Sequence, residues 1–437
     1  MLPQTRTPKA KALVHSPFIR CPGCGTDGTC GVLMVCDRHY VRRCTHCWLD
    51  QRHIPLPALD KKVIYLDQFV ISNMMKELDP DRPTEDKGVK AGFYRTLFEK
   101  LDRLTKLQLA FCPDSPVHDH ESAVDTRYEK LRTVFRHLSH GISLVPPVTI
   151  FHSQLLRAFR AWLWGESLVP APERGFAFSG DFNVWHDRFR IELNYTVAGF
   201  ADALRNTAAA RTKHLHEVCL YWQGMEKFDY HAVYEGELAS IVRHPWQEYL
   251  IWSGRMAAAQ QGPESVDLVP LYPPESASLI THMLQELGAA GVAGAEAGER
   301  LYSFFGSAAA RSVPYARISA LFWAGVAREV HAGRKPNTFP RAGMFNDIDL
   351  VAAYAPFCDA LFIDRQIAIL ASQGELKDEL AGVGRIFSLH EGGEAAFLAY
   401  LDGIEAAAAP EHLLKVAEVY GPDWPTPYLG LLARRRQ

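Results

Sequence analysis

The sequence predicts an α/β chain in three parts: a small cysteine-rich module, a parallel sheet flanked by helices, and a large helical insertion that interrupts the sheet domain. Three observations predict this class. Two Cys-x2-Cys pairs lie near the N-terminus, two apolar runs each end in an aspartate, and a long, mainly helical stretch separates those two runs.

The cysteine-rich module is predicted over residues 1–58. Six of the nine cysteines lie between Cys21 and Cys47, and the pairs Cys21/Cys24 and Cys44/Cys47 have the spacing of a zinc ribbon. Each pair can turn two thiolates towards one Zn²⁺, and two pairs complete a tetrahedral shell without an open coordination position. A structural zinc is therefore expected, because it would fold a segment too short to fold alone.

A second set of ligand types lies inside the first. Cys30, Cys36 and His39 could hold a second, interleaved zinc, since Cys36 and His39 have ligand spacing. The alternative is that Cys30 and Cys36 are small buried hydrophobes.

Basic residues concentrate in the same part of the chain. Residues 1–62 contain ten Lys and Arg against four acids, whereas the remaining residues have a net charge of −9. Basic and aromatic side chains alternate here, which suits phosphate contact and base stacking; they include Arg42, Arg43, Tyr40, His46 and Trp48. Alternatively, this basic face packs against the acidic body of the chain.

The sheet domain is predicted over residues 59–155 and 313–400. Lys61–Asp67 and Ala360–Ile363 are typical of buried strands, and Leu107–Cys112 and Ile386–Leu389 are expected to be shorter ones. Helical periodicity is found over Phe69–Leu78, Phe93–Leu104, Val117–Leu138 and Pro314–Val330, and helices are expected to begin near Asn346 and Ile367.

The remaining residues are predicted to be mostly helical. Residues 156–312 are rich in aromatic side chains and form the expected insertion, in which Ala289–Glu299 is expected to be a loop or a short linker. Residues 401–437 are expected to be a C-terminal helical tail.

Acidic residues at strand ends carry the functional prediction. In an open α/β sheet, ligands bind outside the carboxyl ends of the strands. Asp67 and Asp364 follow the two apolar runs, and Glu121 and Asp347 or Asp349 are expected near the starts of helices. Converging carboxylates repel one another unless a divalent cation lies between them, and Mg²⁺ or Mn²⁺ suits such oxygen ligands. A site of this kind can activate water against a phosphodiester.

The order of these acids resembles that of the PIN-like nuclease family. The stretches that carry the resemblance are IYLDQFVISNM, CPDSPVHDHES and MFNDIDLVAAYAPFCDALFID. The resemblance implies a PIN-like parallel sheet and a metal-dependent endoribonuclease, in which Asp67, Glu121, Asp347 (or Asp349) and Asp364 hold the catalytic Mg²⁺ or Mn²⁺. It also implies RNA rather than DNA as the partner.

A non-catalytic alternative stays open. In it the chain is a zinc-ribbon adaptor for nucleic acid or protein with a degenerate PIN-like fold. This alternative is favoured by Phe362, which stands where the family often has a threonine two residues before its last acid. The four acids in the family's order favour the enzyme.

Further expectations concern substrate contacts and partners. Arg365, Arg341 and Lys335 are expected to hold phosphates of the substrate. A homo-oligomer or an inhibitory protein partner is compatible with the large insertion.

Composition and motifs exclude several classes of protein. With 48% hydrophobic and 22% charged residues, the chain is not a largely disordered or collagen-like one. It contains no apolar run of membrane-spanning length and no apolar leader near its N-terminus, so a cytoplasmic protein is expected. No Gly-rich phosphate loop or G-x-S-x-G elbow occurs, which argues against a P-loop NTPase and an α/β-hydrolase.

Overall fold

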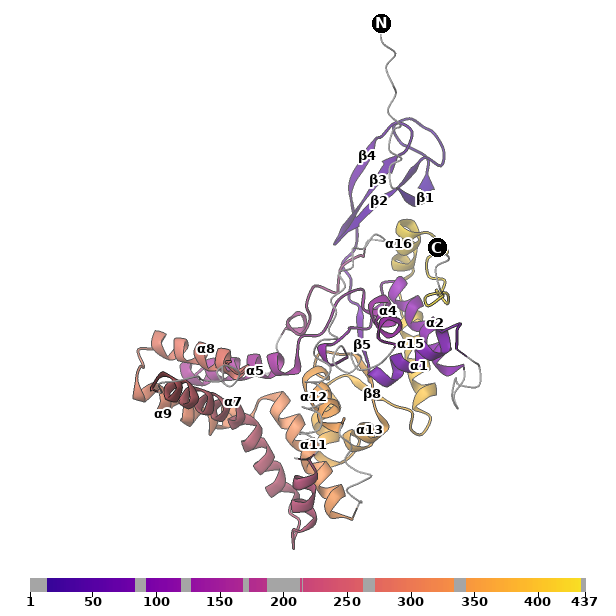
Figure 1. The fold of residues 1–437 in the computed structure, drawn as a ribbon. Helices are drawn as coiled ribbons and strands as arrows, with labels where there is room; N and C mark the ends of the chain where they lie inside the picture. Colours follow the sequence, from indigo (N-terminus) through magenta and orange to yellow (C-terminus); the bar gives the residue numbers. More distant parts are fainter. Residues whose placement is uncertain are drawn as a thin grey trace.

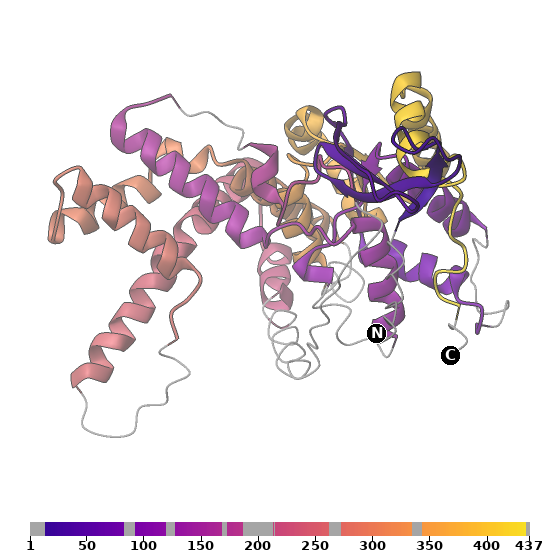
Figure 2. The ribbon, with the colours of Figure 1, turned by 90° about the horizontal axis from the view of Figure 1, so that it is seen from above.

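The structure is a computed structural model that describes most of the chain. The described residues are 14–82, 92–118, 127–167, 173–186, 213, 215–261, 272–333 and 343–433. They form an antiparallel sheet at one end of the molecule, a parallel sheet with helices in the middle, and a helical arm that extends to one side (Figures 1 and 2). The mixed α/β class predicted from the sequence is confirmed.

The N-terminal module is a four-stranded antiparallel sheet in the order β1-β2-β3-β4. Its strands are β1 (His15–Ile19), β2 (Cys30–Cys36), β3 (His39–Cys44) and β4 (Asp50–Pro55). Cys21 and Cys24 lie in the connection from β1 to β2, whereas Cys44 ends β3 and Cys47 lies in the connection to β4. The hairpin of β2 and β3 therefore holds the two cysteine turns at one end of the sheet.

The central sheet has four parallel strands in the order β6-β5-β7-β8. They are β5 (Lys62–Leu66), β6 (Ala110–Phe111), β7 (Ala360–Phe362) and β8 (Arg385–Phe387). The strand predicted over Leu107–Cys112 is shorter than expected, because Leu107–Leu109 form the turn that ends the preceding helix and Gln108 adopts a positive φ of 60°. From β5 the chain goes first to β6 on one side and later to β7 on the other, so the strand order reverses between β5 and β7.

Helices cover both faces of this sheet, which explains why its strands are apolar throughout. Side chains of Ile64 and Leu66 lie in the core of one face, and those of Val63 and Tyr65 lie in the core of the other. The first face packs against α1 (Gln68–Leu78), α2 (Phe93–Lys106), α4 (Tyr128–Ser139) and α15 (Gly393–Ala406); the second packs against α5 (Pro147–Trp164), α11 (Pro314–His331) and α12 (Met344–Tyr354). Two short helices, α13 (Arg365–Ala371) and α14 (Gly374–Glu379), follow β7.

The helical arm shares a core with the second face of the sheet. It contains α7 (Tyr230–Gln261), α8 (Ser276–Ala289), α9 (Ala295–Phe305) and α10 (Ala308–Arg311), and α5 packs against both α12 and α8. The predicted domain boundary between residues 155 and 156 falls inside α5, and the one between 400 and 401 falls inside α15. Side chains of α5 belong to the core on the second face of the sheet, and side chains of α15 belong to the core on the first face.

The prediction of a loop over Ala289–Glu299 is wrong for the second half of this segment. Gly294, with a φ of 63°, ends the connection, and α9 begins at Ala295. Alanine and glutamate are good helix formers, and Ala297 and Leu301 bury their side chains in the arm. None of the helices in the described ranges combines the length and apolar character of a membrane span.

The C-terminal helix α16 (Pro410–Tyr420) joins the N-terminal module to the rest of the molecule. Val32, Val35 and Tyr40 of the module share a small core with Val416 and Val419 of this helix. Figure 2 shows α16 beside the antiparallel sheet.

Arg42 lies inside this contact and is only 2% exposed. Its guanidinium donates hydrogen bonds of 2.7 Å to the Pro17 carbonyl and 2.8 Å to the Glu418 carbonyl. The predicted role of Arg42 in binding substrate phosphates is therefore wrong. For this residue the alternative prediction is correct, because its side chain packs against the rest of the chain. Arg43 instead pairs with Asp50 through Nε and Oδ1 at 2.5 Å and keeps part of its side chain exposed, so its role in substrate binding stays a prediction.

Replacing Arg42 by alanine is expected to loosen the N-terminal module from α16. The change removes the donor of the part-buried Pro17 and Glu418 carbonyls and of the buried Cys30 carbonyl, and a buried group left unsatisfied costs about 1–3 kcal/mol. Urea unfolding should show a lower free energy for Arg42→Ala, and limited proteolysis should cut faster near residue 58. Arg43→Ala serves as the matched control, and the prediction fails if the two variants are equally stable.

Candidate functional site

Four cysteines form a candidate metal centre at the tip of the N-terminal module. The sulfur atoms of Cys21, Cys24, Cys44 and Cys47 all lie within 4.8 Å of one another. Cys21 Sγ is 3.6 Å from Cys47 Sγ, and Cys24 Sγ is 3.8 Å from Cys44 Sγ. These four side chains could bind a metal such as zinc, in the arrangement that the sequence spacing predicts.

Backbone groups and glycines prepare the cysteine turns for this role. The Gly23 N–H donates to Cys21 Sγ at 3.4 Å, and the His46 N–H donates to Cys44 Sγ at 3.3 Å, contacts that favour thiolates. A Cβ atom at Gly23 would lie 2.7 Å from Leu49 Cδ2, so a larger residue there would displace the Leu49 side chain, which is partly exposed. A hydrogen bond with the Thr26 side chain is the main reason why the pKa of Cys24 is lowered to about 5. Thiolates are the metal-binding form of cysteine.

The predicted second zinc set of Cys30, Cys36 and His39 is wrong. Cys30 is opposite Cys44 at one end of the hairpin, whereas Cys36 is opposite His39 at the other end. The seven residues of β2 separate these ends by about 20 Å. Cys30 is fully buried beside Cys21 and Cys44, and burial raises the pKa of its thiol. It is therefore a small buried hydrophobe, as the alternative interpretation expected.

Two of the predicted acids lie at the carboxyl edge of the parallel sheet, each after one of two neighbouring strands. Asp67 follows β5 and Asp364 follows β7, the neighbouring strand. The Asp67 N–H donates to the Phe362 carbonyl at 3.0 Å, which ties the two strand ends together. This place is the point where the strand order reverses, the usual position of a ligand crevice in such sheets.

Both carboxylates also cap the helices that follow them. Asp67 Oδ1 accepts a hydrogen bond from the Phe69 N–H at 3.4 Å, and Asp364 Oδ1 accepts one from the Gln366 N–H at 2.7 Å. A capping aspartate has a fixed orientation and contributes about 1 kcal/mol to its helix. Each residue thus has a structural role as well as its position at the crevice.

The two acids of α12 differ in their surroundings. Asp347 lies in the first turn of α12, and a helix that leads into a parallel strand places its own start at the carboxyl edge of that sheet. Asp349 accepts a hydrogen bond from the Tyr315 hydroxyl of α11 at 2.9 Å. Burial, and then the Asp349 charge, raise the pKa of Tyr315. Its place in the first turn makes Asp347 the stronger candidate to join Asp67 and Asp364 at the carboxyl edge of the sheet, which we call the acidic edge.

Several predicted site residues cannot be placed. Glu121, Lys335 and Arg341 lie outside the described residues. Arg365 begins α13 directly after Asp364 and is exposed. Within the described ranges the four cysteines are the only metal-ligand group found, so Asp67, Asp347 and Asp364 do not form one by themselves.

A buried polar cluster beside the carboxyl edge was not predicted as a unit. Asp114 lies 2.6 Å from Arg132 through Oδ2 and Nη1, and its Oδ1 is 3.4 Å from Nδ1 of His118. On its other side, His118 Nε2 is 3.0 Å from the Tyr65 hydroxyl. His118 is 0% exposed, so this cluster is shielded from solvent on that side. The only sequence signal is the Pro-Asp-Ser-Pro turn, in which Ser115 accepts from the His118 N–H at 3.3 Å.

We expect the purified chain to contain one zinc ion per molecule, measured by mass spectrometry of the metal. Cys44→Ser should lose that zinc, because three thiolates no longer close the tetrahedral shell. Cys36→Ser should keep it and is the matched control. Two zinc ions in the wild-type protein would contradict this prediction, since the described residues contain one such cysteine group.

The Asp114 cluster predicts a pH-dependent contribution to stability. Burial alone would raise the pKa of Asp114, but His118 and Arg132 outweigh burial and lower it below its ordinary value of 3.8. A lowered carboxyl pKa stabilises the folded state above that value, and the contribution is lost as the pH falls through the folded pKa. Asp114→Asn should therefore reduce the free energy of unfolding by about 3 kcal/mol near neutral pH.

That difference between wild type and Asp114→Asn should shrink progressively below pH 3.8, as measured by urea unfolding at a series of pH values. Asp402→Asn removes a carboxylate that is 62% exposed and is the control. A difference that is constant with pH would show that Asp114 is not charged in the folded protein.

Comparison with known proteins adds no assignment: no protein-family model, curated protein or solved structure matches the chain.

Proposed function

We propose that this protein is a metal-dependent endonuclease that hydrolyses phosphodiester bonds in RNA. The observation that carries the proposal is the position of Asp67 and Asp364. Neighbouring parallel strands present both carboxylates at the point where the strand order reverses. The preference for RNA over DNA rests on the resemblance to PIN-like nucleases alone.

The donor set fits a hard divalent cation. Asp67 and Asp364 are half-buried carboxylates on adjacent strands, and Asp347 is placed on the same edge by α12. Mg²⁺ usually binds through one or two carboxylates and keeps several waters, so three carboxylates need not converge within direct ligand distance. Glu121 is a further candidate ligand through the resemblance. When bound, Mg²⁺ or Mn²⁺ would neutralise charge on the phosphodiester and acidify a water.

The protein's own groups would position the reactants. The capping hydrogen bonds from Phe69 and Gln366 hold the two carboxylates in fixed orientations, which is the preorganisation that such a site requires. Arg365 begins the helix after Asp364, so its exposed guanidinium is a candidate contact for a phosphate next to the scissile one. Lys335, Arg341 and Arg43 are further candidates for backbone phosphates.

The four-cysteine centre has a structural role in this proposal. A shell of four thiolates leaves no position for water or substrate, and the centre lies in a separate sheet from Asp67. We therefore assign zinc to the folding of the N-terminal module and the divalent cation at the acidic edge to catalysis.

A second candidate is a non-catalytic zinc-ribbon adaptor for nucleic acid or protein. The observation that favours it is that Asp67 and Asp364 each cap a helix, a role that explains an aspartate without any metal. The two candidates differ in two measurable properties: only the nuclease should cleave a phosphodiester, and only the nuclease should bind a divalent cation at the acidic edge.

The test is cleavage of a labelled mixed-sequence RNA, and of its single-stranded DNA counterpart, in Mn²⁺. Asp67→Asn and Asp364→Asn should each lower the cleavage rate at least ~100-fold, because the amide loses the negative charge that a metal needs. Asparagine caps helices about as well as aspartate, so both variants should stay folded, which circular dichroism would verify.

Asp378→Asn, at an exposed position of α14, is the matched control and should cleave at the wild-type rate. Cleavage that persists in folded Asp67→Asn and Asp364→Asn proteins would refute the proposed site. If the wild-type protein does not cleave either substrate, its titration with Mn²⁺ decides between the two candidates. The adaptor predicts no Mn²⁺ binding beyond the cysteine centre.

A further inference from the structure

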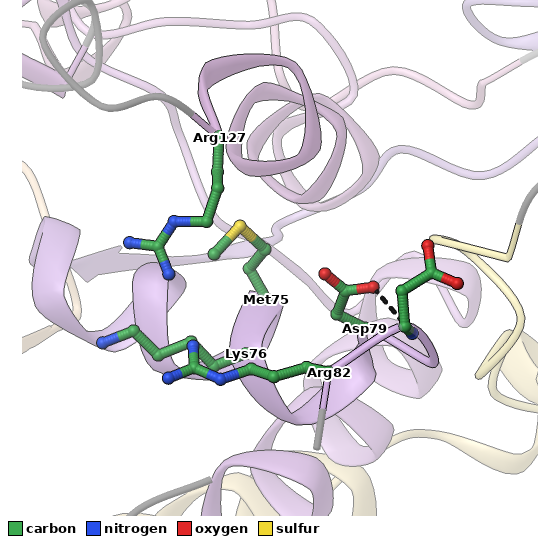
Figure 3. A pocket seen from close by; sticks show the side chains of 6 residues that line it. Met75, Lys76, Asp79, Arg82 and Arg127 are labelled. Atoms are coloured by element: carbon green, nitrogen blue, oxygen red, sulfur yellow. Dashed lines mark hydrogen bonds between the residues drawn. The ribbon is translucent and has the colours of Figure 1, made fainter. Parts of the chain in front are cut away.

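A cavity of about 260 Å³ beside α1 is lined by side chains of both charges (Figure 3). Its lining combines three cationic side chains with Asp79 and Asp81, and Asp79 accepts a hydrogen bond from the Asp81 N–H at 3.1 Å. Lys130 Nζ lies 2.7 Å from both carboxylate oxygens of Asp79. In the sequence, the adjoining residues 83–91 and 119–126 add five acids and two lysines. The charges at this cavity therefore favour neither an anion nor a cation.

A different feature, the pair of cysteine turns in the N-terminal module, contains a strained tryptophan. In each turn the residue after the second cysteine donates its N–H to the carbonyl of the first cysteine, at 2.9 Å from Gly25 and at 3.1 Å from Trp48. The two residues also share a positive φ, which is 70° at Gly25 and 63° at Trp48. Glycine adopts such a φ freely, whereas a bulky side chain is strained there. The first turn thus shows that the backbone alone would favour glycine at position 48.

The indole ring of Trp48 is also exposed to solvent. Trp48 is 39% exposed, although burial of an aromatic ring stabilises a folded chain. The neighbouring Leu49 instead packs on the first turn, where a Cβ atom at Gly23 would lie 2.7 Å from Leu49 Cδ2. Trp48 therefore combines backbone strain with exposed apolar surface. Residues with a strained backbone are concentrated at binding and active sites.

A second exposed ring lies on the outer face of the same sheet, the face that points away from α16. Phe18 is 44% exposed, and its ring covers Gly31 of β2, since a Cβ atom at Gly31 would lie 2.6 Å from Phe18 Cε1. The next residue of β2, Val32, belongs to the core with α16, so Gly31 faces outwards. Two strand spacings, about 10 Å in all, separate β2 from β4, and β4 begins with Asp50, two residues after Trp48.

The module that carries these rings has a positive net charge. Residues 1–58 contain eight Lys and Arg against three Asp, and their net charge of +5 remains +3 when a zinc ion held by four thiolates is included. Residues 1–13, which adjoin the start of β1, contribute three of these bases and no acid. Arg20 and Arg43 each pair with an aspartate, so the excess belongs to the module as a whole. Positive charge together with exposed rings suits a polyanion with unpaired bases.

We propose that Trp48 and Phe18 stack against bases of a single-stranded nucleic acid. Every base has a flat π face, so stacking requires no particular sequence, and the positive charge of the module attracts the phosphates. The strand is RNA or single-stranded DNA, which share this chemistry. The two rings lie in a different sheet from Asp67 and Asp364, so binding here does not require the proposed nuclease function. If that function holds, the module binds the strand outside the acidic edge.

The test measures binding of a labelled single-stranded RNA, and of a DNA strand of the same sequence, to the zinc-loaded full chain without Mg²⁺ or Mn²⁺. Trp48→Gly should weaken binding of at least one strand about 5- to 100-fold, the usual effect of losing one stacked base. The slope of log K against log salt should stay unchanged, because stacking releases no counterions. Phe18→Leu, which keeps an apolar side chain over Gly31, should weaken binding in the same way.

Trp48→Gly also separates a binding role from a structural one. Glycine accepts the positive φ at this position, so the variant should keep its zinc and unfold near the wild-type temperature. Tyr302→Ala removes an exposed ring of α9 and is the matched control, which should bind both strands as the wild type does.

Wild-type affinity for both strands in folded, zinc-containing Trp48→Gly protein would overturn the proposal. The absence of binding of either strand to the wild-type protein would also overturn it and would leave a protein as the partner of this surface. Because binding is measured without cleavage, an inactive acidic edge would not affect the outcome.

Discussion

The hydrogen bonds between β5 and β7 join two parts of the chain that the whole helical insertion separates in sequence. Ile64, Tyr65 and Leu66 pair with Ala360, Leu361 and Phe362, and the Asp67 N–H extends the ladder to the Phe362 carbonyl. This pairing places Asp67 beside Asp364 and fixes the starts of the helices that they cap. The two cores of the sheet domain also depend on it, because each strand supplies alternate side chains to both faces.

Much of this architecture could be predicted because it follows from local patterns. The apolar runs before Asp67 and Asp364, the periodicity of α1, α2 and α11, and the spacing of the four cysteines each determine a local structure that tertiary packing then keeps. The acids at the two strand ends could be predicted for the same reason, since a strand's carboxyl end is visible in the sequence.

The features that could not be predicted depend on contacts between distant residues. Arg42 has the sequence surroundings of a nucleic-acid contact, yet a helix near the other end of the chain covers it. The contact that His118 makes with Tyr65 joins residues 53 positions apart in the chain. Cys30, Cys36 and His39 have ligand chemistry, but the hairpin register separates them, and register is a property of two strands rather than of spacing in one.

The contact between α16 and the N-terminal module has a consequence for synthesis on the ribosome. The module can fold early, but Val416 and Val419, which share a core with Tyr40, and the Glu418 carbonyl, which accepts from Arg42, are made long after it. Strand β5 likewise has no neighbour on one side until residues 360–362 emerge. The nascent chain therefore exposes an unpaired strand edge until β7 has been made, and a chain that ends before β7 would keep that edge open to aggregation.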